Sequence, residues 1–210
     1  MAAAPNLPLS AAETWDITID STYTPSRQGI IVNQGDQINF ENESGVDIII
    51  EFQTNGSGQQ VYPPMNLPVS NGGSNGFTAP NANCAGNYYI YNSDVTPPAQ
   101  LSGPFAIQVG TGAMIVTVSG SFTSPNYSPE TVAVPLGATL ARSGNLQLDT
   151  SSAVFAISWL KSDDPFTPPI TQTDGSSHTV TPGSDLTTYT YYGGPNPNEN
   201  PAGGKVIVQS

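Results

Sequence analysis

The sequence has few of the residues that carry out most protein chemistry. Its 210 residues include one cysteine, one histidine and four cationic side chains. A single cysteine excludes a disulfide within the chain. The four cations are scattered, so they form no basic patch for a nucleic-acid backbone or an anionic membrane surface. The 16 acidic residues bring the net charge to −12, which repels polyanions. We therefore expect no nucleic-acid partner.

Long apolar runs are also missing. No stretch approaches the ~20 apolar residues of a membrane-spanning helix, so we expect no membrane insertion. The first ten residues have neither a cationic start nor a long apolar core, so they do not read as a secretory signal. These features leave the compartment open, including an extracellular place or a surface-exposed particle.

The residues that are abundant indicate β-structure. β-branched and aromatic runs are interrupted by Gly, Pro and Asn every ~8–15 residues, which is typical of a sandwich or barrel. Ile17/Ile19 and Ile38/Phe40 alternate with polar residues, which predicts strands with one buried face. The run Ile48–Ile50 is continuous, which predicts a strand covered on both faces.

Two sets of predicted strands follow each other in the same order. Each set has an opening strand, a short apolar strand after a Pro-containing loop, a Tyr-rich strand and a closing strand. In the first set these are Trp15–Ile19, Ile30–Val32, Tyr88–Tyr91 and Phe105–Val109, and in the second Met114–Val118, Val132–Val134, Tyr189–Tyr192 and Lys205–Val208. We therefore expect an extended N-terminal arm, 1–13, and two domains, 14–110 and 113–210.

This order of motifs resembles the cupredoxin family. In the first set the resemblance rests on the Gly35-Asp36 turn, the strand Gln37–Asn42 that ends in Asn, the strand Gly86–Tyr91 and the closing Phe105–Val109. It implies an all-β fold of two tandem Greek-key cupredoxin-like β-sandwiches.

The resemblance also locates the copper ligands of the family. A blue-copper site uses two His, one Cys and usually an axial Met. The position of the first His is Asp47, and the position of the Cys is Asn92 in one domain and Gly193 in the other. None of the ligands stands in place in either domain. We therefore expect no metal and no cofactor. We call Asp47, Asn92 and Gly193 the slot positions, because the family has copper ligands there and this chain does not.

Other candidate sites have simpler explanations. His178 has no matched nucleophile or metal ligand. Cys84 has no neighbouring cation to activate its thiol. The segment Gly72–Gly76 matches Gly-x-Ser-x-Gly, but that motif works only on a strand-to-helix elbow, and here it lies in a Gly/Asn-rich stretch. We expect no catalytic residues and no enzymatic activity.

Two acidic segments raise the question of Ca²⁺ binding, which needs six to eight oxygen ligands. They are the acids Glu41, Glu43 and Asp47, and the pair Asp163-Asp164. Neither has EF-hand spacing, so solvated acidic loops are favoured, and the sequence leaves calcium binding undecided. The tyrosine clusters either fill a core or form a sugar-stacking platform, and the pattern does not decide this for outward-facing tyrosines.

These observations favour a non-catalytic structural or assembly protein of the surface, coat or matrix type. Its partners are then proteins, including copies of itself, with Leu7, Leu9 and Trp15 as the expected assembly contacts. The alternative is a glycan- or peptide-binding module that uses two long loops, 54–80 and 161–173, because loops of that length usually have a role.

Overall fold

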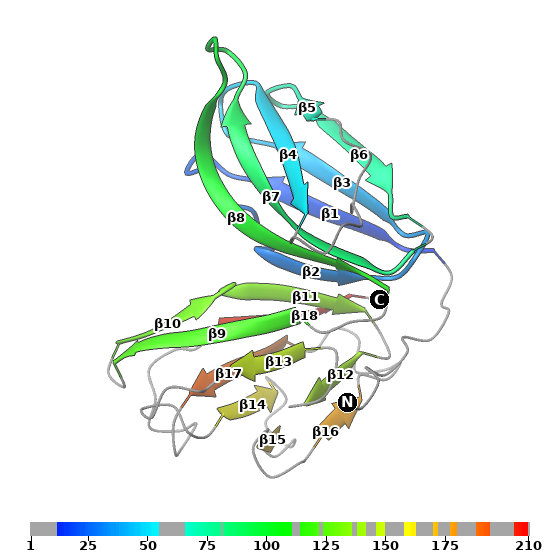
Figure 1. Ribbon diagram of the computed structural model, residues 1–210, viewed down its shortest axis with the longest axis vertical. Coiled ribbons are helices and arrows are strands. Elements are labelled where there is room, and N and C mark those ends of the chain that lie inside the picture. Colours follow the sequence, from blue (N-terminus) through cyan, green and yellow to red (C-terminus); the bar gives the residue numbers. More distant parts are fainter. Residues whose placement is uncertain are drawn as a thin grey trace. The chain divides into compact units, whose positions relative to one another are not determined.

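The structure is a computed structural model of the chain. It describes residues 12–54, 66–80 and 82–110, and then 114–121, 124–135, 138–141, 146–149, 158–162, 170–171, 177–179, 188–193 and 204–209. Every regular element in these ranges is a strand, which confirms the all-β prediction (Figure 1). The described ranges hold no helix long and apolar enough to cross a membrane. The chain divides into two compact units, Leu9–Gly110 and a second that contains Thr111–Ser210.

The first sheet of the Leu9–Gly110 unit has three strands in the order β1-β3-β6. They are β1 (Thr14–Ile19), β3 (Gln37–Asn42) and β6 (Ser74–Thr78). β1 runs parallel to β3, and β6 runs antiparallel to it. The predicted alternation is present, because Trp15, Ile17, Ile38 and Phe40 are fully buried between exposed or half-buried polar neighbours.

The second sheet of this unit has five strands in the order β2-β8-β7-β4-β5. They are β2 (Gly29–Val32), β8 (Ala99–Val109), β7 (Cys84–Asn92), β4 (Ile48–Thr54) and β5 (Leu67–Val69). β2 is parallel to β8, and the other neighbours are antiparallel. β7 and β8 form the long curved hairpin of Figure 1.

Aromatic side chains fill the space between the two sheets. Phe40 of β3 and Tyr88 of β7 meet edge to face with ring centroids 5.3 Å apart, and Phe52 of β4 meets Phe77 of β6 at 5.2 Å. The buried Tyr88 hydroxyl donates a 3.0 Å hydrogen bond to the Arg27 carbonyl. Contacts between strands of different sheets make this unit a two-layer sandwich.

The second unit also has two sheets. One has the order β10-β9-β13-β12-β16, from β9 (Met114–Ser121), β10 (Ser124–Ser128), β12 (Thr139–Ala141), β13 (Leu146–Asp149) and β16 (Ser177–Thr179). The other has the order β11-β18-β17-β14-β15, from β11 (Thr131–Pro135), β14 (Ser158–Ser162), β15 (Ile170–Thr171), β17 (Thr188–Gly193) and β18 (Gly204–Gln209).

The five-stranded sheet containing the Tyr-rich strand has the same plan in both units. In each, a short strand lies parallel to the closing strand, β2 to β8 and β11 to β18. The closing strand is antiparallel to the Tyr-rich strand, β7 or β17. The Tyr-rich strand is antiparallel to β4 or β14, whose outer neighbour is β5 or β15.

Several strands differ from the sequence-based expectation. β5 and β6 both lie inside the expected long loop 54–80, and β15 lies inside the expected loop 161–173. β5 contains Pro68, which an edge strand tolerates because its outer N–H groups need no partner in the sheet. The strand over Ile48–Ile50 is not covered on both faces, because Ile48 and Ile50 are buried while Ile49 is half-buried.

Candidate functional site

The end of β3 is organised by one buried amide, that of Asn42. Its Nδ2 donates to the carbonyls of Val46 (2.8 Å) and Val69 (2.9 Å). Its Oδ1 accepts from the backbone N–H (3.0 Å) and the hydroxyl (2.6 Å) of Ser44. This side chain therefore holds the turn that leads into β4. The chain reverses direction in that turn at Gly45, which has φ +90°.

That turn delivers Asp47 to the end of β7. The Asp47 carbonyl accepts from the Ser93 N–H at 3.0 Å, and its N–H donates to Asp94 Oδ2 at 3.3 Å. Its carboxylate accepts from the Asn71 N–H at 2.8 Å. Asn92, the last residue of β7, accepts the Asp94 N–H on Oδ1 at 2.8 Å. We call Asp47, Asn71, Asn92 and Asp94 the polar cluster.

The two slot positions of the first unit therefore lie close together. Asn92 stands opposite Ile48, the neighbour of Asp47, in the β4–β7 register. Gly193 occupies the matching place in the second unit, since it is the last residue of β17 and stands opposite Ser158 of β14. In the polar cluster both carboxylates accept backbone hydrogen bonds, so the side chains at this end of the unit hold loops together.

Cys84 lies at the other end of the strand that carries Asn92. It is the first residue of β7, is buried and forms no disulfide. Asn92 lies eight positions further along the extended strand, which corresponds to about 26 Å. Burial raises the pKa of the Cys84 thiol, so little reactive thiolate forms at neutral pH. The thiol cannot reach the polar cluster, and its surroundings are those of a structural cysteine.

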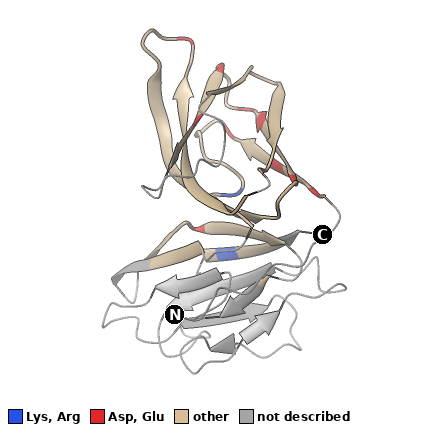
Figure 2. Cartoon of the chain, turned by 45° about the vertical axis from the view of Figure 1, so that its right-hand side comes forward, with Lys and Arg blue, Asp and Glu red and all other residues tan. Residues whose placement is uncertain are grey.

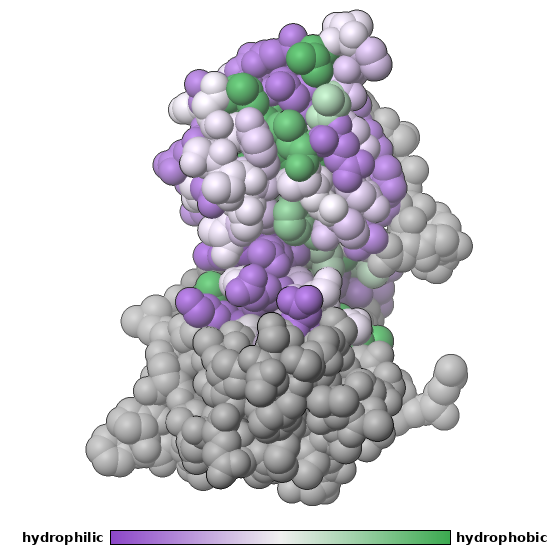
Figure 3. Space-filling model, turned by 90° about the vertical axis from the view of Figure 1, so that its left-hand side faces the viewer, coloured by the Kyte–Doolittle hydropathy of each residue, from purple (hydrophilic) through white to green (hydrophobic). Residues whose placement is uncertain are grey.

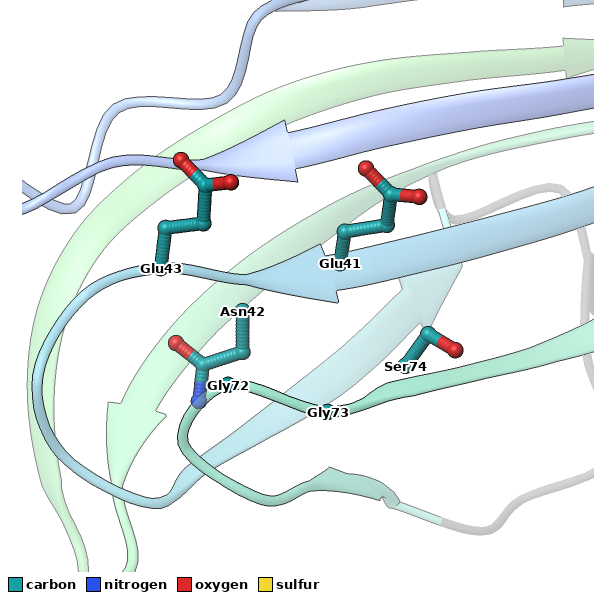
Figure 4. Close-up of a pocket in the computed structure, with 6 residues that line it drawn as sticks. All are labelled: Glu41, Asn42, Glu43, Gly72, Gly73 and Ser74. Atoms are coloured by element: carbon teal, nitrogen blue, oxygen red, sulfur yellow. The ribbon is translucent and has the colours of Figure 1, made fainter.

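A pocket of about 360 Å³ lies beside the polar cluster, between the end of β3 and the start of β6 (Figure 4). Glu41 and Glu43 line one side with exposed carboxylates, and Gly72, Gly73 and Ser74 line the other. The Thr18 hydroxyl donates to Glu41 Oε2 at 3.1 Å. The pocket offers hydrogen-bond acceptors to a small polar group.

The Gly-x-Ser-x-Gly match has no nucleophile geometry. Ser74 is the exposed first residue of β6, opposite Glu41, and the segment continues as a strand instead of entering a helix. Gly76 lies against β3, where an added Cβ would come 2.3 Å from Asn39 Oδ1. The glycine is required by packing against β3, which explains this part of the motif.

The three acids Glu41, Glu43 and Asp47 do not converge. Glu41 and Glu43 line the pocket, while Asp47 belongs to the polar cluster. In the part of the chain that the structure describes, no group of three His, Cys, Asp or Glu side chains could hold a metal ion. Asp163-Asp164 lie outside the described residues. Acidic side chains are spread over several strands and turns of the unit, as Figure 2 shows.

One expected assembly contact is corrected by the structure. Trp15 is fully buried on the core side of β1, its Nε1 donates to Asp36, and Arg27 lies over its ring at 5.7 Å. It cannot present its side chain to a neighbouring molecule. The strand alternation, with Trp15 in phase with Ile17, was the signal for this. Leu7 and Leu9 lie outside the described residues.

Three residues remain: His178, which the structure places only through its backbone, and Asn71 and Asp94, which the sequence did not predict. His178 lies on β16 opposite Leu140. Asn71 and Asp94 were not predicted to meet Asp47, because nothing in the local sequence links residues 24 or 47 positions apart.

The architecture is thus that of an all-β protein whose described sheets are mixed parallel and antiparallel, with hydrogen-bonding side chains at Asp47 and Asn92. No protein-family model and no curated protein sequence matches the chain.

Among solved structures, the chain is similar to cupredoxins and multicopper oxidases. An amicyanin mutant in its Cu(I) form shares 15% identity with a TM-score of 0.33, over 46% of this chain and 81% of that chain. A blue copper oxidase from Nitrosomonas europaea shares 14% identity with a TM-score of 0.35, over 94% and 86%. A laccase from Pediococcus acidilactici shares 11% identity with a TM-score of 0.34, over 100% and 63%. The likeness is one of fold, and the copper chemistry belongs to those proteins.

Proposed function

We propose that this protein is a non-catalytic structural or assembly protein of the surface, coat or matrix type, built on two tandem cupredoxin-like sandwiches without copper. The observation that carries the proposal is the polar cluster. At Asp47 and Asn92, where the resemblance expects ligands, the side chains accept backbone hydrogen bonds at 2.8 Å and tie two loops together. Because these side chains are engaged in hydrogen bonds to the backbone, this end of the sandwich suits a rigid structural role better than metal binding or catalysis.

The tandem arrangement is supported by strand order. The sheets β2-β8-β7-β4-β5 and β11-β18-β17-β14-β15 have the same sequence of parallel and antiparallel neighbours. Two rigid units in one chain suit a protein whose task is to space or connect partners.

The contact element in this proposal is the N-terminal arm. Pro5 and Pro8 favour an extended conformation, and Leu7 and Leu9 are its apolar anchors. An extended segment can add to an open sheet edge of a neighbouring molecule, satisfying that edge's free backbone groups. Burial of the two leucines contributes roughly 3–6 kcal/mol before association entropy is subtracted, so a particle would need many such contacts.

Light scattering over a concentration series tests the arm. We expect the full chain to self-associate with rising concentration and a chain that starts at Glu13 to stay monomeric. The double variant Leu7→Ala/Leu9→Ala should behave like the shortened chain, and Asn6→Ala like the full chain. If all four proteins are monomeric at every concentration, assembly through the arm is wrong.

The alternative is a glycan- or peptide-binding module that uses the loops 54–80 and 161–173. β5, β6 and β15 occupy parts of both segments, which shortens the stretches left as loop and weakens this version. A panel of polysaccharides tests this version when it is run on the original chain and on a variant in which residues 55–65 are replaced by a Gly/Ser segment of equal length, since the loop version expects binding that is lost with that replacement and the assembly proposal expects none that depends on it.

A further inference from the structure

Two tyrosines lie on the outer face of the five-stranded sheet in the Leu9–Gly110 unit. β7 alternates strictly, so Tyr88 and Ile90 are fully buried while Tyr89 and Tyr91 are half-buried on the opposite face. Two positions of one strand on the same face lie about 7 Å apart, so the two rings form one patch on the sheet. The core therefore accounts for Tyr88 but not for these two rings.

Neighbouring strands add polar groups around the tyrosines. Glu51 of β4 stands opposite Tyr89, and Ile49 stands opposite Tyr91. On the other side, Gln100 of β8 stands opposite Tyr91. Gln53 Nε2 donates to Glu51 Oε1 at 2.7 Å, which orients that carboxylate. We call these six residues the tyrosine face: Ile49, Glu51, Gln53, Tyr89, Tyr91 and Gln100.

The Tyr89 ring is held against the sheet. Gly103 has φ +111°, and an added Cβ there would lie 2.9 Å from Tyr89 Cδ1. The ring thus covers the glycine of the neighbouring strand, at the place where the β7–β8 register shifts. The ring therefore lies close to the β8 backbone, and part of it remains exposed to solvent.

Tyr91 stays a neutral hydrogen-bonding group. Burial, then the charges of Glu51 and Tyr89, raise the pKa of the Tyr91 hydroxyl. The effect of Glu51 agrees with the register, because Glu51 lies two residues along β4 from Ile49, the residue opposite Tyr91. A neutral phenol, a carboxylate and two amides then project from one face and supply both hydrogen-bond donors and acceptors.

We propose that the tyrosine face is a binding site for a neutral polysaccharide chain. The apolar C–H faces of successive sugar rings would stack on Tyr89 and Tyr91, and their hydroxyls would hydrogen-bond to Glu51 and Gln100. A mixed surface of aromatic rings and oriented polar groups suits a ligand that alternates C–H and hydroxyl groups.

Charge and hydropathy favour this occupant over others. Residues 9–110 contain nine carboxylates and one cation, Arg27, so an anionic polysaccharide is repelled. The cores of protein interfaces are depleted of charged residues, whereas the carboxylate residue Glu51 stands within the tyrosine face, opposite Tyr89. Among the described residues, the only large exposed hydrophobic side chains are Val95 and Ile115, which lie outside the tyrosine face. Figure 3 likewise shows separate small apolar patches among hydrophilic side chains. The inference does not depend on assembly through the arm.

Affinity electrophoresis of the full chain tests the site. The gels contain a soluble β-1,3-glucan, a xyloglucan, a galactomannan or a dextran, with alginate as the anionic control, and calorimetry follows with the strongest binder. We expect retardation by at least one neutral polysaccharide and not by alginate. Tyr91→Ala and Tyr89→Ala should weaken binding about tenfold. Tyr91→Phe keeps the ring and should retain most of the affinity. It keeps the test valid if an alanine variant folds poorly.

Carboxylate variants supply the matched comparison. Glu51→Gln should weaken binding several-fold, while Glu43→Gln, just after the end of β3 in the other sheet, should leave it unchanged. The proposal is overturned if none of the neutral polysaccharides retards the protein, or if both tyrosine-to-alanine variants bind like the original. It is also overturned if Glu43→Gln weakens binding as much as Glu51→Gln. A self-association that disappears in Tyr91→Ala would assign the face to a second copy of the chain instead.

Discussion

The indole Nε1 of Trp15 donates a 2.9 Å hydrogen bond to Asp36 Oδ2, and both side chains are fully buried. The same carboxylate accepts the backbone N–H groups of Glu13 at 3.0 Å and Asn33 at 2.8 Å. One buried anion therefore joins the start of β1 to the turn before β3. A buried carboxylate is tolerated when several N–H donors face it.

Glu13 is placed unfavourably beside this anion. Its Oε2 is buried and has no hydrogen-bond partner among the described residues. Burial, and then the charge of Asp36, raise the pKa of the Glu13 carboxyl. The folded state thus binds this proton more tightly than the unfolded state. Ionised Glu13 consequently destabilises the fold above its folded pKa, and this penalty vanishes as the pH falls below the unfolded pKa.

We therefore expect Glu13→Gln to raise the melting temperature at pH 7, with a smaller gain at pH 4. Thermal unfolding followed by circular dichroism at both pH values measures the difference from the original protein. Glu43→Gln, at an exposed position, is the control and should change little at either pH. An equal gain from Glu13→Gln at both pH values would contradict the electrostatic explanation.

Asn42→Ala should be strongly destabilising. It removes two donated and two accepted hydrogen bonds at a buried position and leaves the Val46 and Val69 carbonyls without this donor. Buried groups without partners cost about 1–3 kcal/mol each, so we expect a loss of about 3 kcal/mol in the free energy of unfolding, measured in urea. Asn75→Ala is the matched control, because Asn75 makes its bonds at an exposed position. Equal losses would disprove the special role of Asn42.

Two glycines should respond differently to alanine. At Gly76 an added Cβ would meet both Asn39 Oδ1 and the Ile38 carbonyl at 2.3 Å, so β3 and β6 must separate. At Gly45 the space is open, and only the left-handed backbone disfavours a side chain. We expect Gly45→Ala to cost about 1–2 kcal/mol and Gly76→Ala at least about 3 kcal/mol. Urea unfolding of both variants checks the order, and a smaller cost at Gly76 would refute the close approach of the strands.

We expect the protein to be colourless and free of copper after purification from copper-supplemented cells. The slot residues Asp47, Asn92 and Gly193 supply neither thiolate nor imidazole, and Cys84 lies at the far end of β7. Elemental analysis and a visible spectrum measure this. Stoichiometric copper with a thiolate charge-transfer band would show that the copper-ligand positions of the family have been assigned to the wrong residues.

Much of the fold could be predicted from local patterns. The limits of β3 match the sequence analysis residue for residue, and β1 and β2 each begin one residue earlier than predicted. The reason is that period-two alternation and β-branched runs are local properties of a strand with a buried face. β6 escaped prediction because Ser74, Asn75 and Gly76 have poor strand propensity. It is a strand through its pairing with β3 and the burial of Phe77.

The sequence by itself determined the all-β class, the acidic charge balance and the lack of a full copper-ligand set, because these follow from composition and residue spacing. Only the tertiary structure decided that Trp15 is a core residue bound to Asp36, that Asp47 meets Asn71 and Asp94, and that Tyr89 rests on Gly103. These relationships join residues 14 to 47 positions apart. Strand register and burial bring such residues together, and neither can be read from a local window of sequence.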